Sequence, residues 1–113
     1  MPPRDFRIRI RDIITAAEKI ISNTQDMDFE SFSTDDWTID AVLRNITVIG
    51  EAAGHIPDEV CNSYPDIPWR EIRDMRNIIV HEYFGVDLGI IWNAIRYDLP
   101  KLIPELKKIP GDG

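Results

Sequence analysis

An arginine, a histidine and a tyrosine stand close together in one segment of this sequence, and their side chains are suited to phosphate chemistry. The segment reads Arg76-Asn77-Ile78-Ile79-Val80-His81-Glu82-Tyr83. Arginine is always charged and binds phosphate oxygens through paired hydrogen bonds, whereas histidine exchanges protons near neutral pH. The chemistry that fits is metal-independent cleavage of an RNA phosphodiester, in which a base activates the ribose 2′-hydroxyl and a cation stabilises the charge on phosphorus.

Helical geometry separates these groups around the axis of the segment. At about 100° per residue, Arg76 and Tyr83 lie on nearly the same line, and Asn77 shares an adjacent stripe with His81. Arg76 and His81 diverge by roughly 140° on an ideal helix. Three routes could bring them to one pocket: long side chains that reach around the helix, a distorted helix end near Gly85, or a symmetric dimer. A dimer would also supply two histidines, one as base and one as acid.

Spacing of this kind also occurs on ordinary helix surfaces. In that interpretation the arginine forms a surface ion pair with Asp74 or Glu82, and the histidine caps the end of the helix. Glu51 and His55 stand four residues apart, as metal ligands on a helix do, but no further pair completes a site. Cys61 is the only cysteine, which favours an inert thiol. The sequence therefore predicts neither a metal nor another cofactor.

Composition and charge narrow the class of protein. The chain has 113 residues, 43% of them hydrophobic, and we expect one soluble domain over residues 1–113. Its start lacks the long apolar run of a signal peptide, and no stretch approaches the roughly 20 apolar residues of a membrane span, so we expect a cytoplasmic protein. The formal net charge of -7 argues against non-specific coating of nucleic acid, although local basic patches escape that argument.

The elements that must position the segment are helices, because apolar residues recur at helical spacing along most of the chain. We expect helices from near Pro3 to near Asn23, from Thr34–Asp36 to near His55, from Pro68 to about Phe84, and from near Asp87 onward. A polar connection over 25–34 and a short helical turn over 58–62 join them. Pro100 and Pro104 predict a kink or a break in the last helix. The predicted fold class is all-α, an antiparallel up-down bundle of four to five helices.

Small residues and tryptophans add two expectations about packing. The second predicted helix carries Gly50, Ala52, Ala53 and Gly54 near its end. An interior glycine costs a helix about 1 kcal/mol relative to alanine, a cost that close approach of another helix, within the chain or across a dimer, would offset. Of the three tryptophans, we expect Trp69 and Trp92 in the core and treat Trp37 as the exception.

The segment and its surroundings resemble the HEPN superfamily, and specifically its HepT-like toxins. Arg76 and His81 with four residues between them, followed by Glu82 and Tyr83, match the R-x4-6-H-x-Y signature. Similar phrases extend over nearly the whole chain: Arg44-Asn45-Ile46-Thr47-Val48-Ile49-Gly50-Glu51-Ala52-Ala53, Ile56-Pro57, Pro68-Trp69-Arg70-Glu71-Ile72, Met75-Arg76-Asn77 and Asp98-Leu99-Pro100. R-x4-H alone is a weak signal, but this combination in this order is fairly specific.

The resemblance implies a homodimeric helical bundle that acts as a metal-independent endoribonuclease toxin on an RNA substrate. Arg76 and His81 would be catalytic at the dimer cleft, and Asn77, Tyr83 and Glu51 would support them. The implied partner is a small nucleotidyltransferase antitoxin of the MntA type, which transfers AMP onto Tyr83 and silences the nuclease. Added phosphates beside the arginine would occupy the site and repel RNA.

Two hypotheses from other classes remain open on the sequence. The first is a non-catalytic helical partner that binds nucleotide or presents substrate to a minimal nucleotidyltransferase. The second is a purely structural dimerisation module. RNA cleavage that is lost with His81→Ala separates the nuclease from both. A neighbouring gene for a short nucleotidyltransferase would favour the nuclease and the non-catalytic partner over the structural module.

Overall fold

The computed structural model describes residues 5–110, apart from the side chain of Phe84. Within that range the chain folds into helices, turns and bends, with no strand, which confirms the predicted all-α class. In chain order the elements are α1 (Phe6–Thr24), α2 (Phe29–Ser33), α3 (Asp36–Gly54), α4 (Asp58–Ser63), α5 (Trp69–His81), the 3-10 helix η1 (Tyr83–Gly85), α6 (Leu88–Asn93), the π-helical segment η2 (Ala94–Asp98) and α7 (Leu99–Lys107). No helix in this part of the chain is both long enough and apolar enough to cross a membrane.

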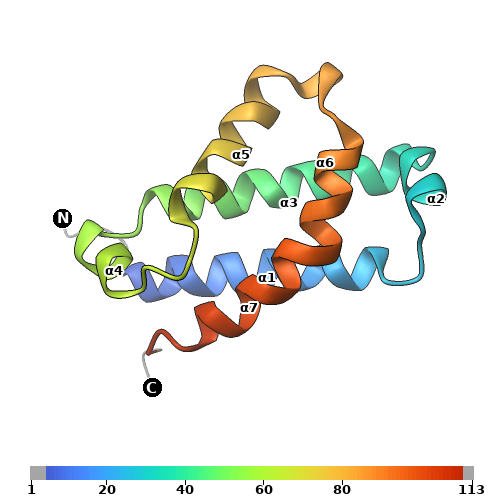
Figure 1. Cartoon of the computed structure of the whole chain (residues 1–113). Coiled ribbons are helices and arrows are strands. Elements are labelled where there is room, and N and C mark those ends of the chain that lie inside the picture. The colour runs from blue at the N-terminus through green and yellow to red at the C-terminus, as the bar shows by residue number, and fades with distance from the viewer. Residues whose placement is uncertain (1–4, 111–113) are drawn as a thin grey trace.

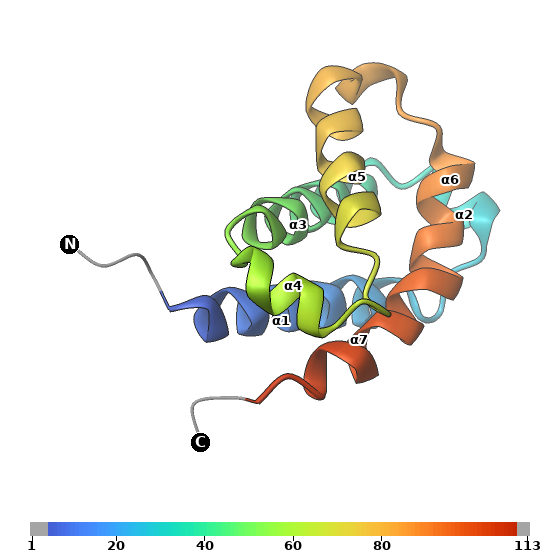
Figure 2. The ribbon, with the colours of Figure 1, turned by 60° about the vertical axis from the view of Figure 1, so that its left-hand side comes forward.

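Two long helices, α1 and α3, form the base of the molecule and lie side by side in opposite directions (Figures 1 and 2). Each begins at an aspartate whose carboxylate accepts a backbone N–H of the first turn: Asp5 from Arg7 at 2.9 Å and Asp35 from Thr38 at 3.1 Å. Asp35 is one of the residues expected to cap this helix. The predicted start of the first helix near Pro3 lies outside the described residues.

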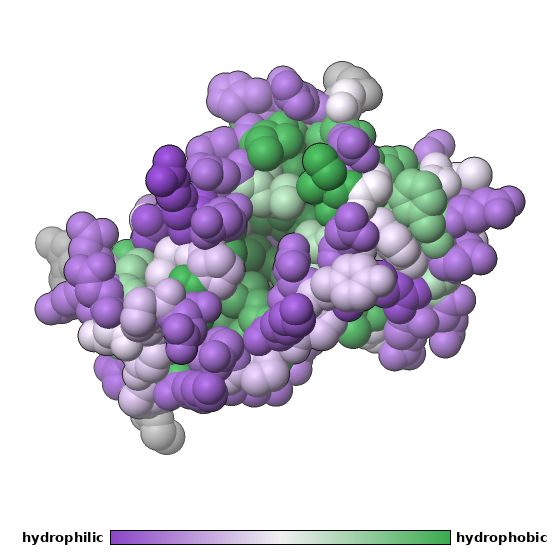
Figure 3. Space-filling view, in the orientation of Figure 1, coloured by the Kyte–Doolittle hydropathy of each residue, from purple (hydrophilic) through white to green (hydrophobic). Residues whose placement is uncertain are grey.

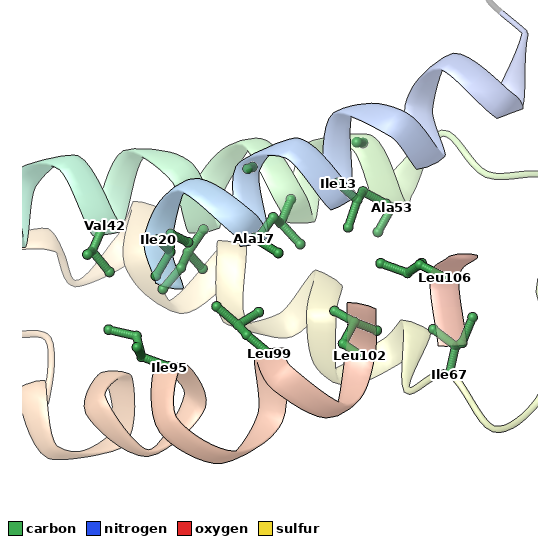
Figure 4. Close-up of a cluster of buried hydrophobic side chains, with 14 of the residues drawn as sticks. Ile13, Ala17, Ile20, Val42, Ala53, Ile67, Ile95, Leu99, Leu102 and Leu106 are labelled. Carbon is green, nitrogen blue, oxygen red and sulfur yellow. The ribbon is translucent and has the colours of Figure 1, made fainter. Parts of the chain in front are cut away.

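The core lies between this pair and the C-terminal helix (Figure 4). Its fully buried members come from one apolar stripe of each helix, as helical periodicity predicts. Those labelled in Figure 4 are Ile13, Ala17 and Ile20 of α1, Val42 and Ala53 of α3, Ile67 of the connection before α5, and Ile95, Leu99, Leu102 and Leu106 of the C-terminal helix. Trp69 is buried, Trp92 packs against the cluster and Trp37 is 88% exposed, as expected.

The polar connection predicted over 25–34 contains the short helix α2. Asp28 accepts the Ser31 N–H at 2.8 Å, and the Ser31 hydroxyl accepts the Asp28 N–H, so both ends of the first turn are satisfied. Phe32 is fully buried and its ring stacks on that of Trp92 at 5.0 Å. One buried aromatic therefore anchors a short helix within a connection that the sequence had described only as polar.

The C-terminal helix follows a continuous helical path through α6, η2 and α7, with a visible change of direction (Figure 1). The Leu99 N–H donates to the Ala94 carbonyl, a spacing of five residues that defines a π-turn. Pro100 follows in the first turn of α7, and Pro104 lies inside α7. The expected interruption is thus a π-helical segment and a bend rather than a break, because the longer turn absorbs the residue that lacks an N–H.

Arg96, within η2, ties the C-terminal helix to the end of α1. Its guanidinium donates to the backbone carbonyls of Thr24 and Met27 and lies 4.4 Å from the centre of the Trp92 ring. These carbonyls stand at or just beyond the end of α1; that of Thr24 also accepts the Met27 N–H at 3.0 Å, so Arg96 is its second donor. A single cation therefore ties the end of one helix to another.

Helix α5 crosses α3 obliquely and touches it at Gly50 (Figures 1 and 2). A Cβ added at Gly50 would lie 2.1 Å from the Cβ of Arg76, whereas one added at Gly54 would meet nothing within 4 Å. The predicted close approach is confirmed at Gly50, and it occurs within one chain. The glycine sets the distance of Arg76 from α3.

Gly50→Ala is expected to lower the free energy of unfolding by about 1–3 kcal/mol, since the added methyl group would collide with Arg76. Urea denaturation measures the change. Gly54→Ala is the matched control, because the same substitution there adds a methyl group in open space and should leave stability equal or slightly higher. Equal effects at both positions would contradict a role for Gly50 in seating α5.

Candidate functional site

Arg76 lies on the side of α5 that meets α3, with its guanidinium held between two polar neighbours. Its Nη2 donates to the Glu51 carboxylate of α3 at 2.5 Å, and its Nη1 donates to the Asn77 side-chain oxygen at 3.1 Å. The Arg76 side chain remains 32% exposed. Three of the predicted site residues, Arg76, Asn77 and Glu51, are therefore in direct contact.

The ion pair between Arg76 and Glu51 presents a charged, partly solvated edge to an incoming anion. Nε of Arg76 is buried and has no hydrogen-bond partner among the described residues, so a bound anion would have to contact the terminal nitrogens. Those nitrogens are the ones that grip phosphate oxygens. Glu51 holds the guanidinium in place and competes with phosphate for the same edge. The alternative partners considered for the arginine, Asp74 and Glu82, are not the ones it contacts.

Tyr83 lies in η1, beyond the end of α5, and reaches back to α3. The predicted helix over 68–84 is too long: α5 ends at His81, and a 3-10 turn follows, in which the Gly85 N–H donates to the Glu82 carbonyl. The Tyr83 hydroxyl donates to the Asp40 carboxylate at 3.1 Å. The expectation that Tyr83 continues the line of Arg76 along one helix is therefore wrong, because a change of helix type intervenes.

The hydrogen bond to Asp40 raises the pKa of Tyr83, because a carboxylate acceptor favours the protonated phenol; desolvation adds to the effect. Tyr83 is 44% exposed and borders a shallow pocket of about 410 Å³. The other lining residues are Asp36, Ile39, Asp40, Leu43, Val86 and Leu88. The pocket has an apolar floor and acidic side chains at its edge, with the phenol among them.

His81 is the last residue of α5 and is exposed. Its imidazole makes no hydrogen bond to the described part of the chain, unlike Arg76 and Tyr83. Arg76 points toward α3, and an ideal helix directs His81 roughly 140° away from it. The structure thus brings Arg76, Asn77 and Glu51 together, pairs Tyr83 with Asp40, and leaves the histidine facing solvent.

Asp40 is the one residue of this region that the sequence interpretation missed. The available signal was its spacing: Asp40 and Glu51 are eleven residues apart, which puts them within about 20° on one stripe of α3. On the facing segment, formed by α5 and η1, Arg76 and Tyr83 are seven residues apart in sequence. Two acidic residues on one helix thus face a cation and a phenol from the next segment.

The remaining candidates from the sequence do not join the site. No group of three or more metal-ligating side chains occurs among residues 5–110, and Glu51 binds Arg76 instead of pairing with His55. The Cys61 thiol is partly buried and receives a hydrogen bond from Arg73 at 3.4 Å. Desolvation raises the pKa of this thiol, so it stays protonated.

The fold and these residues define a class: an all-helical domain that carries an R-x4-H-x-Y sequence where one helix ends against another, as expected of a HEPN-type domain. A family model described as ribonuclease HepT-like matches residues 13–109. The chain belongs to the HepT-like ribonuclease family, which confirms the predicted family and its class of enzyme.

Two relatives agree with the family match over nearly their full lengths. The chain is 39% identical over 112 residues to "Putative RNase MJ0125" of Methanocaldococcus jannaschii, which covers 99% of this chain and 97% of the relative. It is 38% identical over 106 residues to "Probable ribonuclease HepT" of Thermococcus cleftensis, covering 94% of this chain and 96% of the relative. No solved structure matches the chain significantly.

Asp40→Asn is expected to lower the pKa of Tyr83 toward that of a free phenol, since it removes the anion that stabilises the protonated form. Titration of tyrosine labelled with ¹³C at Cζ, followed by NMR and assigned with Tyr83→Phe, measures the shift. Asp36→Asn is the control, because Asp36 borders the same pocket without bonding the phenol. An unchanged pKa in Asp40→Asn would contradict the observed hydrogen bond.

Proposed function

We propose that this chain is a metal-independent endoribonuclease toxin that cleaves RNA with Arg76 and His81. The observation that carries the proposal is the Arg76 guanidinium, held by Glu51 and Asn77 with its terminal nitrogens at the surface, in a chain of the HepT-like ribonuclease family. The guanidinium would bind the scissile phosphate and stabilise its developing charge. His81 would transfer the proton of the attacking 2′-hydroxyl or of the leaving group.

Glu51 and Asn77 support this function by orienting the arginine. Asn77 restrains Nη1, and Glu51 restrains Nη2 through the ion pair. A phosphate would share or displace the contact to Glu51, so the carboxylate also prevents tight binding of any passing anion. This arrangement suits a chain of net charge -7, whose affinity for RNA must come from one local site.

A homodimer would complete the site, since the arginine and histidine of one chain diverge. An apolar groove of about 520 Å³ runs between α5 and the C-terminal helix on the face shown in Figure 3, where hydrophobic side chains gather. Ile72 and Met75 line it from α5, and Ala94 and Leu99 from the other side. Exposed Ile78, Ile90 and Tyr97 continue the same helices.

We assign this apolar face to a second copy of the chain. Ile78 lies about 60° from His81 around α5, so the face extends to the edge of the histidine. A copy docked there would bring its own His81 to the same cleft and supply both an acid and a base. Exposed apolar surface on several neighbouring helices is typical of a protein interface.

The proposed partner is an MntA-type nucleotidyltransferase antitoxin that adds AMP to Tyr83, in the cytoplasm where RNA and ATP are available. The Tyr83 side chain is 44% exposed and borders an open pocket, so a second enzyme can reach its hydroxyl. Each added AMP brings a negative phosphodiester. That charge would compete with RNA for Arg76 and repel the RNA backbone.

Purified chain is expected to cleave a mixed RNA pool in the presence of EDTA, and His81→Ala is expected to reduce the rate by about 10²–10⁴-fold, the usual contribution of a general acid or base. Gel analysis of labelled RNA measures the rate. His55→Ala is the matched control, because the other histidine is exposed and lies outside the site. Arg76→Ala should lose activity as well.

Size-exclusion chromatography with light scattering should show that wild type and His81→Ala are both dimers. Cleavage that persists in His81→Ala would refute the assigned role of the histidine. Binding of ATP or of the transferase without any cleavage by wild type would favour a non-catalytic partner of the transferase. A wild type that neither cleaves RNA nor binds ATP or the transferase, together with an Arg76→Ala variant that remains a dimer, would favour a structural module.

Modification of Tyr83 with AMP is expected to abolish RNA cleavage, whereas Tyr83→Phe should retain most of it and resist modification. The reason is charge: the substitution removes only the hydroxyl, but AMP adds an anionic phosphodiester that would repel the RNA backbone. Intact-protein mass spectrometry measures the extent of modification, and the RNA assay measures its effect. A fully modified chain that still cleaves RNA would contradict the proposed silencing.

A further inference from the structure

Asp40 is the residue of this region whose contacts the proposed function does not yet use. Its carboxylate accepts the Tyr83 hydroxyl at 3.1 Å, across a sequence separation of 43 residues. Asp40 is exposed, and Tyr83 is 44% exposed. Water could solvate both groups, so burial does not force them to form this hydrogen bond. The contact joins α3 to η1 at the mouth of the 410 Å³ pocket.

We propose that Asp40 prepares Tyr83 as a nucleophile: it orients the hydroxyl and accepts its proton when a nucleotidyl group is transferred to the phenol. This assignment rests on the proposed modification of Tyr83. The acceptor is already within hydrogen-bond distance of the proton that must leave, which is the geometric requirement for a general base.

The transfer balances without any further oxidant or reductant. The Tyr83 Oη attacks the α-phosphorus of ATP held by the transferase, and a bond forms between them. The bond from the α-phosphorus to the oxygen that bridges to the β-phosphorus breaks, and pyrophosphate leaves with the electron pair. The phenolic proton moves to Asp40, which is exposed and returns it to water.

The unmodified phenol needs such a base because it is held in its protonated form. Asp40 favours the neutral hydroxyl at rest, so the tyrosine carries no charge until a phosphorus atom is close enough for attack. Asp36 borders the same pocket but makes no hydrogen bond to the phenol. It therefore serves as a control carboxylate of the same charge. Asp36, Asp40 and Tyr83 are the titratable groups that line the pocket.

The product reverses the interaction. After transfer the Tyr83 oxygen has no proton to donate, and the new phosphodiester is an anion beside the carboxylates of Asp40 and Asp36. Like charges at this distance repel. The hydrogen bond to Asp40 is therefore lost once the tyrosine has reacted, and repulsion moves the modified side chain away from α3.

The test compares wild type, Asp40→Asn, Asp40→Ala and the control Asp36→Asn as substrates of the purified nucleotidyltransferase with α-³²P-ATP. Asparagine can still accept the hydrogen bond but takes up no proton. We expect Asp40→Asn to lower kcat for modification by about 100-fold or more with little change in KM for the chain, whereas Asp40→Ala should alter both. Asp36→Asn should behave as wild type.

The pH profile separates a base from a merely structural contact. With Asp40→Asn the rate should rise about tenfold per pH unit across neutral and mildly alkaline pH, because the reaction then depends on the phenolate fraction. Wild type should depend far less on pH in that range. RNA cleavage by the unmodified Asp40→Asn chain and its urea denaturation midpoint show that the variant is folded.

The experiment distinguishes failure of the role assigned to Asp40 from failure of the proposed modification of Tyr83. Modification of Asp40→Asn at the wild-type rate, or a reduced rate with the wild-type pH profile, would overturn the role of Asp40 as base and leave the silencing of Tyr83 in place. Absence of modification of folded wild type would refute the silencing and the role of Asp40 with it. RNA cleavage by the same preparation would still test the nuclease independently.

Discussion

The site depends on the close contact of α5 with α3 at Gly50. Because the glycine has no side chain, the backbone of α5 comes near enough for Arg76 to reach Glu51 and, further along, for Tyr83 to reach Asp40. A larger residue would separate both pairs at once. The two acidic residues share one stripe of α3, so a single helix surface positions the cation and the phenol together.

The fold could be predicted to a large extent from the sequence, because the long helices follow from the spacing of their apolar residues. Aspartates at positions such as 35 also mark where helices begin. The sequence was less informative where a tertiary contact decides the backbone: Phe32 belongs to a short helix within the polar connection because it is buried against Trp92. The interruption expected at Pro100 is present, but no local pattern predicts its form, a π-turn.

The candidate site was predictable as a set of residues but not as an arrangement. Arg76, Asn77 and Glu51, which the family resemblance assigned to one site, are in contact, but residue spacing did not predict the ion pair between Arg76 and Glu51 because it joins two separate helices. Tyr83 does not continue that geometry, because α5 ends two residues before it and the chain turns. Its partner Asp40 lies 43 residues away in the sequence, and the only signal for it is the spacing that puts Asp40 and Glu51 on one stripe of α3.

The anchoring of α1 by Arg96 has a consequence for synthesis of the protein on the ribosome. The Thr24 carbonyl already accepts the Met27 N–H, so the turn that ends α1 forms without Arg96. Only the tie from this turn to the C-terminal helix needs the Arg96 guanidinium, about 70 residues further along the chain, and contacts of such long range form late in folding. During synthesis, α1 and its closing turn can therefore form before the helix to which they are later joined has left the ribosome.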